Sequence, residues 1–255
     1  MLELQNFSSG YPGNPVLQDI SLTFSQGSVT VIVGPNGCGK STLLKAMAGI
    51  LPASGSVKLD GRELLTLSRR ELAKTIAFLP QNRTVPEITA KNLVLHGRFP
   101  YLSYPRRYRQ EDHRLASEAM EKMGIGDLAD RPLATLSGGQ RQKVYIAMAL
   151  AQDTPVILLD EPNTFLDISH QLQLMEQTRQ LAAEGKTVVL VLHDLAMALE
   201  YADSLAVLSG GNCLFQGNPE EIYLSGNLDR AFGVPVQRIQ TPTGWKYYFS
   251  HKNAL

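Results

Sequence analysis

The sequence predicts an α/β fold with a mostly parallel sheet that is covered by helices on both faces. Three short apolar runs, residues 28–33, 155–161 and 186–194, are rich in valine, isoleucine and leucine and have the length of buried strands. A helical pattern over residues 168–185 separates the last two runs. Continuous apolar strands that alternate with helices are typical of a parallel sheet buried on both faces.

The composition indicates an ordinary globular protein. The 255 residues suit one large domain or two small ones. Lysine and arginine total 24, as do aspartate and glutamate, so there is no basic excess and we expect no nucleic-acid partner. Cys38 and Cys213 form no disulfide framework, which favours a reducing compartment. No apolar stretch approaches the roughly 20 residues of a spanning helix, so we expect a protein that does not cross a membrane by itself.

The first third of the chain alternates between strand and helix patterns. Residues 2–7 alternate like a strand with one exposed face, and residues 28–33 precede a glycine-rich stretch. Residues 41–51 have a helical pattern. Residues 55–61 are expected to form a strand that ends in an Asp-Gly turn, and residues 75–81 a strand that Pro80 stops.

The middle and the end of the chain have a different character. Helical patterns dominate residues 87–135, interrupted at 98–109 by a stretch rich in proline, tyrosine and arginine. We therefore expect a helical insertion with a broken segment inside it. Residues 236–250 are expected to form a hairpin around the turn at 241–244.

Residues 34–41, GPNGCGKS, match the pattern G-x-x-x-x-G-K-[ST] between a predicted strand and a predicted helix. Glycines let backbone N–H groups surround a phosphate chain; Lys40 is expected to reach the β- and γ-phosphates, and Ser41 to hold Mg²⁺. The alternative is a plain glycine-rich turn. The residues expected to bind nucleotide here are Gly34, Pro35, Asn36, Gly37, Cys38, Gly39, Lys40, Ser41 and Thr42.

Polar side chains end three of the predicted strands, at the edge of a parallel sheet where ligands bind. Asp160 and Glu161 point to opposite faces because they are neighbours on a strand, so Asp160 is assigned to Mg²⁺ and Glu161 to the attacking water. His193 is expected to orient the γ-phosphate or that water. Gln81 is a candidate for touching Mg²⁺ or the water, with a surface glutamine as the alternative. For the acidic pair the alternative is a solvated strand end, and for His193 a structural or surface histidine.

A second glycine-rich helix start follows at residues 136–140, LSGGQ. Ser137 suits a helix N-cap, and the free N–H groups behind it attract anions. Taken alone, this stretch is equally a well-capped helix whose glycines permit close packing. One chain thus contains two candidate phosphate-binding helix starts.

The motifs at 34–42, Gln81, 136–140, 156–161, 165–167 and His193 occur in the order found in the nucleotide-binding subunits of ABC transporters, which the sequence resembles over nearly its whole length. The resemblance implies a P-loop NTPase-type fold with a mostly parallel core sheet, an antiparallel β subdomain and an inserted helical subdomain. It implies one ABC ATPase domain over residues 1–255. Its expected parts are a core (1–86 and 154–233), a helical subdomain (87–153) and a C-terminal hairpin (234–255).

The resemblance also implies that two copies form a head-to-tail dimer. Each ATP then lies between residues 34–42 of one copy and Ser137, Gly138, Gly139 and Gln140 of its partner. Tyr11 matches the aromatic residue that stacks on adenine, unless it is a plain turn residue, and Asp167 matches the aspartate that couples the two sites. The stretch before Asp167 departs from the usual pattern at Asn163, Thr164 and Phe165.

Residues 96–107, HGRFPYLSYPRR, resemble the ATPases of iron-siderophore, haem and cobalamin uptake. This implies an ATP-hydrolysing importer subunit that energises a separate polytopic permease, with a substrate-binding protein as an indirect partner. The expected location is peripheral, on the cytoplasmic face of the bacterial inner membrane. Arg98, Tyr101, Arg106 and Arg107 are candidate permease contacts, or else a solvated basic loop. The alternatives are an exporter ATPase and, in another class, an ABC protein of DNA repair or translation.

Overall fold

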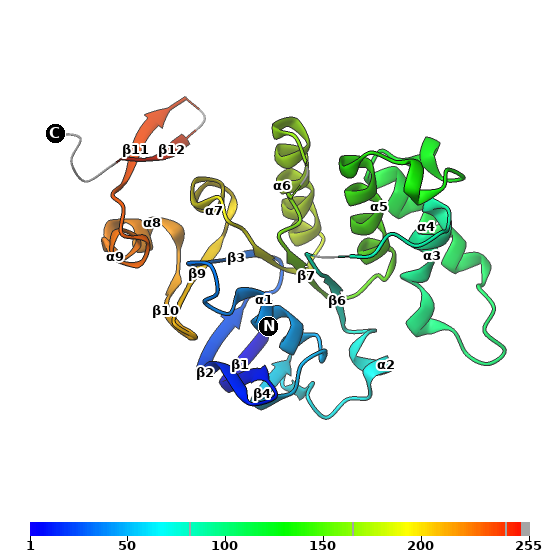
Figure 1. The fold of residues 1–255 in the computed structure, drawn as a ribbon, viewed down its shortest axis with the longest axis horizontal. Helices are drawn as coiled ribbons and strands as arrows, with labels where there is room; N and C mark the ends of the chain where they lie inside the picture. Colours follow the sequence, from blue (N-terminus) through cyan, green and yellow to red (C-terminus); the bar gives the residue numbers. More distant parts are fainter. Residues whose placement is uncertain (82, 165, 243, 251–255) are drawn as a thin grey trace.

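The computed structural model describes residues 1–81, 83–164, 166–242 and 244–250. Its central sheet has the strand order β10-β9-β3-β8-β7-β6 within these residues (Figure 1). The pairs β9–β3, β3–β8, β8–β7 and β7–β6 are parallel, and only β10 pairs antiparallel. The strands are β3 (Val29–Val33), β6 (Ile76–Leu79), β7 (Val156–Asp160), β8 (Thr187–Val191), β9 (Ser204–Ser209) and β10 (Asn212–Gly217). The predicted α/β class with a mostly parallel sheet is confirmed.

Both faces of this sheet are buried because each face contributes to a different hydrophobic core. On β3, Val31 and Val33 belong to one core, whereas Ile32 belongs to the other. The first core includes side chains from α5 (Gly138–Ala151), α6 (Ile168–Ala183) and α7 (Leu195–Tyr201). The second includes side chains from α1 (Lys40–Met47). Neighbouring strand residues point to opposite faces, so a fully apolar strand needs cover on both.

A second sheet, antiparallel and ordered β2-β1-β4-β5, packs on the α1 side and lies at the bottom of Figure 1. Its strands are β1 (Leu2–Tyr11), β2 (Asn14–Phe24), β4 (Ala53–Leu59) and β5 (Arg62–Glu63). The predicted strand at residues 2–7 is thus longer. The sequence patterns indicated no strand at β2, where the pairing with β1 shifts between Phe7–Ile20 and Ser9–Leu17. Such an irregularity interrupts the alternation by which strands are recognised.

Helices dominate residues 90–151, which agrees with the helical pattern predicted for 87–135, and residues 102–109 are not helical, in line with the broken segment predicted at 98–109. The helices α3 (Ala90–His96), α4 (Gln110–Lys122) and α5 pack on one another at the right of Figure 1. Short 3₁₀ turns join them at η1 (Phe99–Tyr101), η2 (Gly126–Leu128) and η3 (Leu133–Thr135). A further short helix, α2 (Arg69–Leu72), precedes β6.

The end of the described chain contains α8 (Pro219–Leu224), α9 (Asn227–Phe232) and a hairpin of β11 (Val236–Thr241) and β12 (Gly244–Phe249). This confirms the predicted hairpin; Thr243 in its turn lies outside the described residues. Among the described residues, none of the helices has the length and apolar character needed to span a membrane.

One candidate permease contact is wrong. Arg98 is only 6% exposed, and its Nε donates to Asp112 Oδ1 at 3.0 Å. Its Nη1 donates to the carbonyls of Ala151 and Gln152 at 3.0 and 3.2 Å, and the guanidinium lies 3.9 Å from the centre of the Tyr101 ring. Arg98 therefore joins η1 to α4 and to the end of α5, whereas Arg106 and Arg107 remain exposed.

We expect Arg98→Met to lower the free energy of unfolding by about 3–5 kcal/mol, because it leaves a buried carboxylate without its partner. Burial raises the pKa of Asp112, but hydrogen bonds from the Arg109 N–H and from Arg98 outweigh it and hold this pKa below its ordinary value of 3.8. A carboxyl with a lowered pKa stabilises the fold above its ordinary pKa, and this stabilisation is lost as the pH falls through the folded value.

The Arg98→Met deficit should therefore be full near neutral pH and shrink in strong acid. Denaturant titrations at several pH values measure it. Arg114→Met is the matched control, since Arg114 pairs with Glu111 and Glu118 on the exposed face of α4 and should change stability little. An Arg98→Met variant with the same free energy of unfolding as the wild type would contradict the structural role of Arg98.

Candidate functional site

The phosphate loop (residues 34–42) connects β3 to α1 and needs its glycines for different reasons. A Cβ on Gly34 would lie 2.1 Å from the carbonyl oxygen of Leu208, so only glycine fits this close approach. Gly37 and Gly39 have φ of +77° and +106°, which other residues rarely adopt. The close approach to β9 thus fixes one side of the loop. The loop leads directly into the N-terminus of α1, where backbone N–H groups attract anions.

Lys40 and Ser41 begin α1 and make opposite kinds of contact. The Lys40 side chain folds back over the loop, and its Nζ donates to the carbonyls of Gly34 and Pro35 at 2.8 and 3.0 Å. The Ser41 hydroxyl donates to Asp160 Oδ1 at 3.0 Å. Asp160 is 1% exposed, and burial raises the pKa of its carboxyl. The Lys40 amino group therefore lies over the loop, and the Ser41 hydroxyl meets the Asp160 carboxylate at the start of the same helix.

Glu161 lies at the centre of the second group of predicted residues. It is 6% exposed, and its Oε1 lies 2.6 Å from Nε2 of His193. Its Oε2 accepts a hydrogen bond from Gln81 Nε2. Gln81 follows β6, Glu161 follows β7 and His193 follows β8, so three neighbouring strand ends bring these side chains together. Both carboxylate oxygens are thereby held in a defined orientation.

Apart from Asp160, which is buried, the side chains of these two groups line one hollow of about 490 Å³. The sequence had singled out most of its lining: Tyr11, Asn36, Gly37, Gly39, Lys40, Ser41, Thr42, Gln81, Glu161 and His193. Asn14 and Val16 of β2 also line it and were missed; closeness to Tyr11 in sequence was the only signal. Gly34, Pro35 and Cys38 do not line it. The Cys38 side chain is buried in the core beside α1, and burial raises its pKa.

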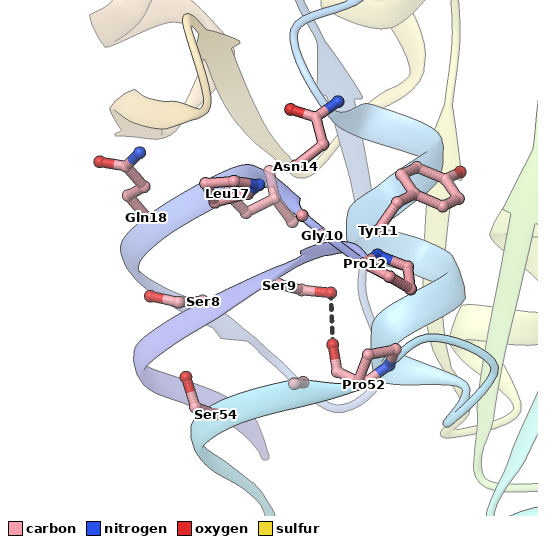
Figure 2. A pocket seen from close by; sticks show the side chains of 13 residues that line it. Ser8, Ser9, Gly10, Tyr11, Pro12, Asn14, Leu17, Gln18, Pro52 and Ser54 are labelled. Atoms are coloured by element: carbon pink, nitrogen blue, oxygen red, sulfur yellow. Dashed lines mark hydrogen bonds between the residues drawn. The ribbon is translucent and has the colours of Figure 1, made fainter.

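Tyr11 stands between this hollow and a second one of about 620 Å³, shown in Figure 2. The second hollow lies where β1, β2 and the start of β4 meet, and the Ser9 hydroxyl there donates to the carbonyl of Pro52 at 2.8 Å. The Tyr11 side chain remains 45% exposed. Its ring therefore offers a flat surface at the mouth of the hollow that holds the phosphate loop.

The second predicted helix start lies in a different hollow. Ser137 caps α5: its Oγ accepts from the Gln140 N–H at 3.2 Å, and Gln140 Oε1 accepts from the Ser137 N–H at 3.0 Å. The signature loop (residues 137–140) and Asp167 line a hollow of about 700 Å³ that contains none of the phosphate-loop residues. One chain thus does not bring its own two helix starts together.

Asp167 caps α6 beside the signature loop. Its Oδ1 accepts from the His170 N–H at 2.9 Å and lies 2.8 Å from His170 Nδ1. The backbone hydrogen bond from His170, followed by the contact with its side chain, lowers the pKa of Asp167. Phe165, where the sequence departs from the expected pattern, lies outside the described residues.

Comparison with known proteins agrees with this geometry. The family model described as ABC transporter matches residues 17–164, which include the phosphate loop, the signature loop and Glu161. The chain belongs to the ABC transporter family. Family membership makes it an ABC-type ATPase subunit, as its motifs predict.

Relatives within the ABC transporter family cover nearly the whole chain. The ferric enterobactin transport ATP-binding protein FepC of Escherichia coli is 43% identical over 93% of this chain and 89% of its own length. The probable siderophore transport ATP-binding protein YusV of Bacillus subtilis is 39% identical, over 94% of this chain and 89% of its own length. Others, at 38–43% identity, are named for achromobactin, ferric hydroxamate, petrobactin and haem.

Solved ABC structures have the same fold. A transporter described as metal-chelate type, in an inward-facing conformation, superposes with a TM-score of 0.85 at 28% identity, covering 100% of this chain and 99% of the matched chain. The dimeric structure of the bacterial ABC transporter cassette MJ0796 gives 0.75 at 30% identity, over 86% and 99% of the two chains. These matches confirm the expected fold class.

Proposed function

We propose that this chain is the ATPase subunit that energises import of a ferric chelate of the siderophore type through a separate membrane permease. The observation that carries this proposal is the single hollow that Lys40, Ser41 and the Glu161–His193 pair line, with the buried Asp160 hydrogen-bonded to Ser41. The relatives named for siderophore transport support the substrate class. The proposed location is the cytoplasmic face of the bacterial inner membrane.

Mg²⁺ fits the donor set at the start of α1. The Ser41 hydroxyl and the buried Asp160 carboxylate are oxygen ligands, which this ion prefers, and the Gln81 amide lines the same hollow. We assign Ser41 and Gln81 to the ion and Asp160 to the ion and its waters. Bound there, Mg²⁺ neutralises charge on the phosphates of ATP.

The side chains have separate roles in hydrolysis. The phosphate loop binds the phosphate chain through backbone N–H groups, and Lys40 supplies the positive charge for the β- and γ-phosphates. Glu161, oriented by His193 and Gln81, positions the attacking water and accepts its proton. Tyr11 receives the adenine on its exposed ring.

A second copy completes the site. Because the hollow that all four signature-loop residues line contains no residue of the phosphate loop, the signature loop is available to the nucleotide of a partner copy. Closure places Ser137, Gly138, Gly139 and Gln140 over the γ-phosphate, and Asp167 beside the loop couples the two sites. Two-fold symmetry gives two ATP per dimer. The dimeric cassette MJ0796 supports this arrangement.

The proposed division of the chain follows the sequence boundaries: a core (1–86 and 154–233), a helical subdomain (87–153) and the hairpin (234–255). On the helical subdomain, the exposed Arg106 and Arg107 and the half-buried Tyr101 are the remaining permease contacts. A substrate-binding protein is an indirect partner.

The substrate class is tested by uptake into proteoliposomes that contain the chain, its permease and a binding protein. We expect ATP-dependent accumulation of a ferric siderophore, and no accumulation with Glu161→Gln. Haem and cobalamin are the comparison substrates. Accumulation of haem or cobalamin alone would overturn the siderophore assignment, and outward flux of the chelate would favour the exporter alternative.

A further inference from the structure

Gln142 is a buried side chain on α5, two residues after the signature loop, and it lines neither the phosphate-loop hollow nor the hollow that contains Ser137. It is 3% exposed and uses both ends of its amide. Its Nε2 donates to the carbonyl oxygen of Pro162, and its Oε1 accepts from Arg83 Nη2 at 2.7 Å. One side chain thus joins three segments: α5, the residue that follows Glu161, and the segment that follows Gln81.

Arg83 and its neighbour bind α5 through two further contacts. The Arg83 guanidinium lies 4.4 Å from the centre of the Tyr145 ring, and the Tyr145 hydroxyl donates to the carbonyl of Thr84 at 2.7 Å. Among the described residues, Arg83 Nη1 is buried and has no hydrogen-bond partner. The guanidinium is therefore held by its stacking on Tyr145 and by Gln142.

The backbone of Glu161 explains why such an anchor is needed. Glu161 has a φ of +50°, in the left-handed region that residues other than glycine seldom adopt. A residue persists there only when its surroundings determine its conformation. On one side the Glu161 N–H donates to Val191 O at 3.2 Å. On the other side, Gln142 holds the carbonyl of the next residue, Pro162.

We propose that Gln142 is a positioning residue for Glu161, and that it acts through the Pro162 carbonyl with its amide oriented by Arg83. The proposal rests on the role proposed above for Glu161. Because Gln142 lies on the helix that Ser137 caps, it also links the signature loop of a chain to the catalytic carboxylate of the same chain. Closure of that loop on a partner's nucleotide would then change the position of Glu161 in the same chain.

Two substitutions separate the bonds of Gln142. Gln142→Leu removes both, whereas Gln142→Glu keeps an acceptor for Arg83 and loses the donor to Pro162. We expect kcat for ATP hydrolysis to fall by about 10- to 100-fold in both, since small displacements of a reacting group have effects of this size. KM and the Kd of a non-hydrolysable ATP analogue should be unchanged, because the phosphate loop is untouched.

A matched control is Gln177→Leu, which removes an amide-to-carbonyl bond of 2.7 Å between α6 and Lys122 at the end of α4. It should leave kcat as in the wild type. If Gln142→Leu fails to fold, Gln142→Glu alone carries the test. A wild-type kcat in a folded Gln142→Glu variant, or equal losses of kcat and analogue affinity, would overturn the proposal.

A double-mutant cycle tests the path through Arg83. Arg83→Met should lower kcat on its own but change it by less than about 2-fold in the Gln142→Leu background. Independent, multiplying effects would contradict the path. Glu161→Gln distinguishes the two levels: if it retains turnover, the role of Glu161 is wrong; if it is inactive while the Gln142 variants hydrolyse normally, only the positioning role is wrong.

Discussion

Glu161→Gln is expected to slow ATP hydrolysis by about 10²- to 10⁴-fold, the usual contribution of a positioned acid–base group. The amide has nearly the same shape as the carboxylate, and its remaining oxygen can still accept the hydrogen bond from Gln81, while its NH₂ group faces His193. What is lost is the negative oxygen that orients the attacking water and accepts its proton. ATP affinity should remain, because Lys40 and the phosphate loop are unchanged. Phosphate release and analogue binding, measured on the same preparation, separate the two effects.

The matched control for this variant is Glu184→Gln. Glu184 pairs with Lys122 on the surface, remote from the hollow that contains the phosphate loop, and its loss should not alter turnover. Hydrolysis at a near-wild-type rate by Glu161→Gln would refute the assignment of Glu161.

Ser137→Arg is expected to abolish turnover while the single chain still binds ATP. Ser137 lies in a hollow that shares no residue with the phosphate-loop hollow, so a large cation there does not reach the nucleotide of its own chain. In the proposed dimer it lies against the γ-phosphate of the partner, where its bulk prevents closure. We expect a decrease in kcat of at least about 100-fold, comparable to the loss of a key transition-state donor.

Ser68→Arg separates this effect from the loss of a helix cap. Ser68 caps α2 through the same reciprocal bonds with Glu71 that Ser137 makes with Gln140. Removing either cap costs about 1 kcal/mol of stability, but only the Ser137 variant should lose turnover. If ATP binding by the isolated Ser137→Arg chain collapses instead, the loop does not act across chains.

The sequence predicted those parts of the fold and site that depend on residue type and short-range spacing. Residue type and spacing are enough to recognise the continuous apolar strands, the glycines before Lys40 and the carboxylates at the end of β7. Their convergence also follows, because parallel strands present their carboxyl ends at one edge of a sheet.

What the sequence did not predict depends on tertiary contacts. Arg98 lies in a basic, aromatic stretch whose composition is typical of an exposed surface. In the structure, however, Arg98 is buried against Asp112 and the end of α5. The side-chain direction of Cys38 within the phosphate loop, the bridging role of Gln142 and the contribution of Asn14 require the folded neighbours. Spacing identifies a loop, but not which of its side chains face the ligand.

The central claim is that ATP is bound between two copies of this chain. The direct test is the mass in solution of the purified Glu161→Gln chain, measured by sedimentation or light scattering with Mg²⁺ and ATP. The account predicts a dimer that holds two ATP and dissociates into monomers when ATP is removed. The Glu161→Gln chain that also carries Ser137→Arg should remain a monomer. A chain that binds ATP yet stays monomeric at every concentration, with and without its permease, would contradict it.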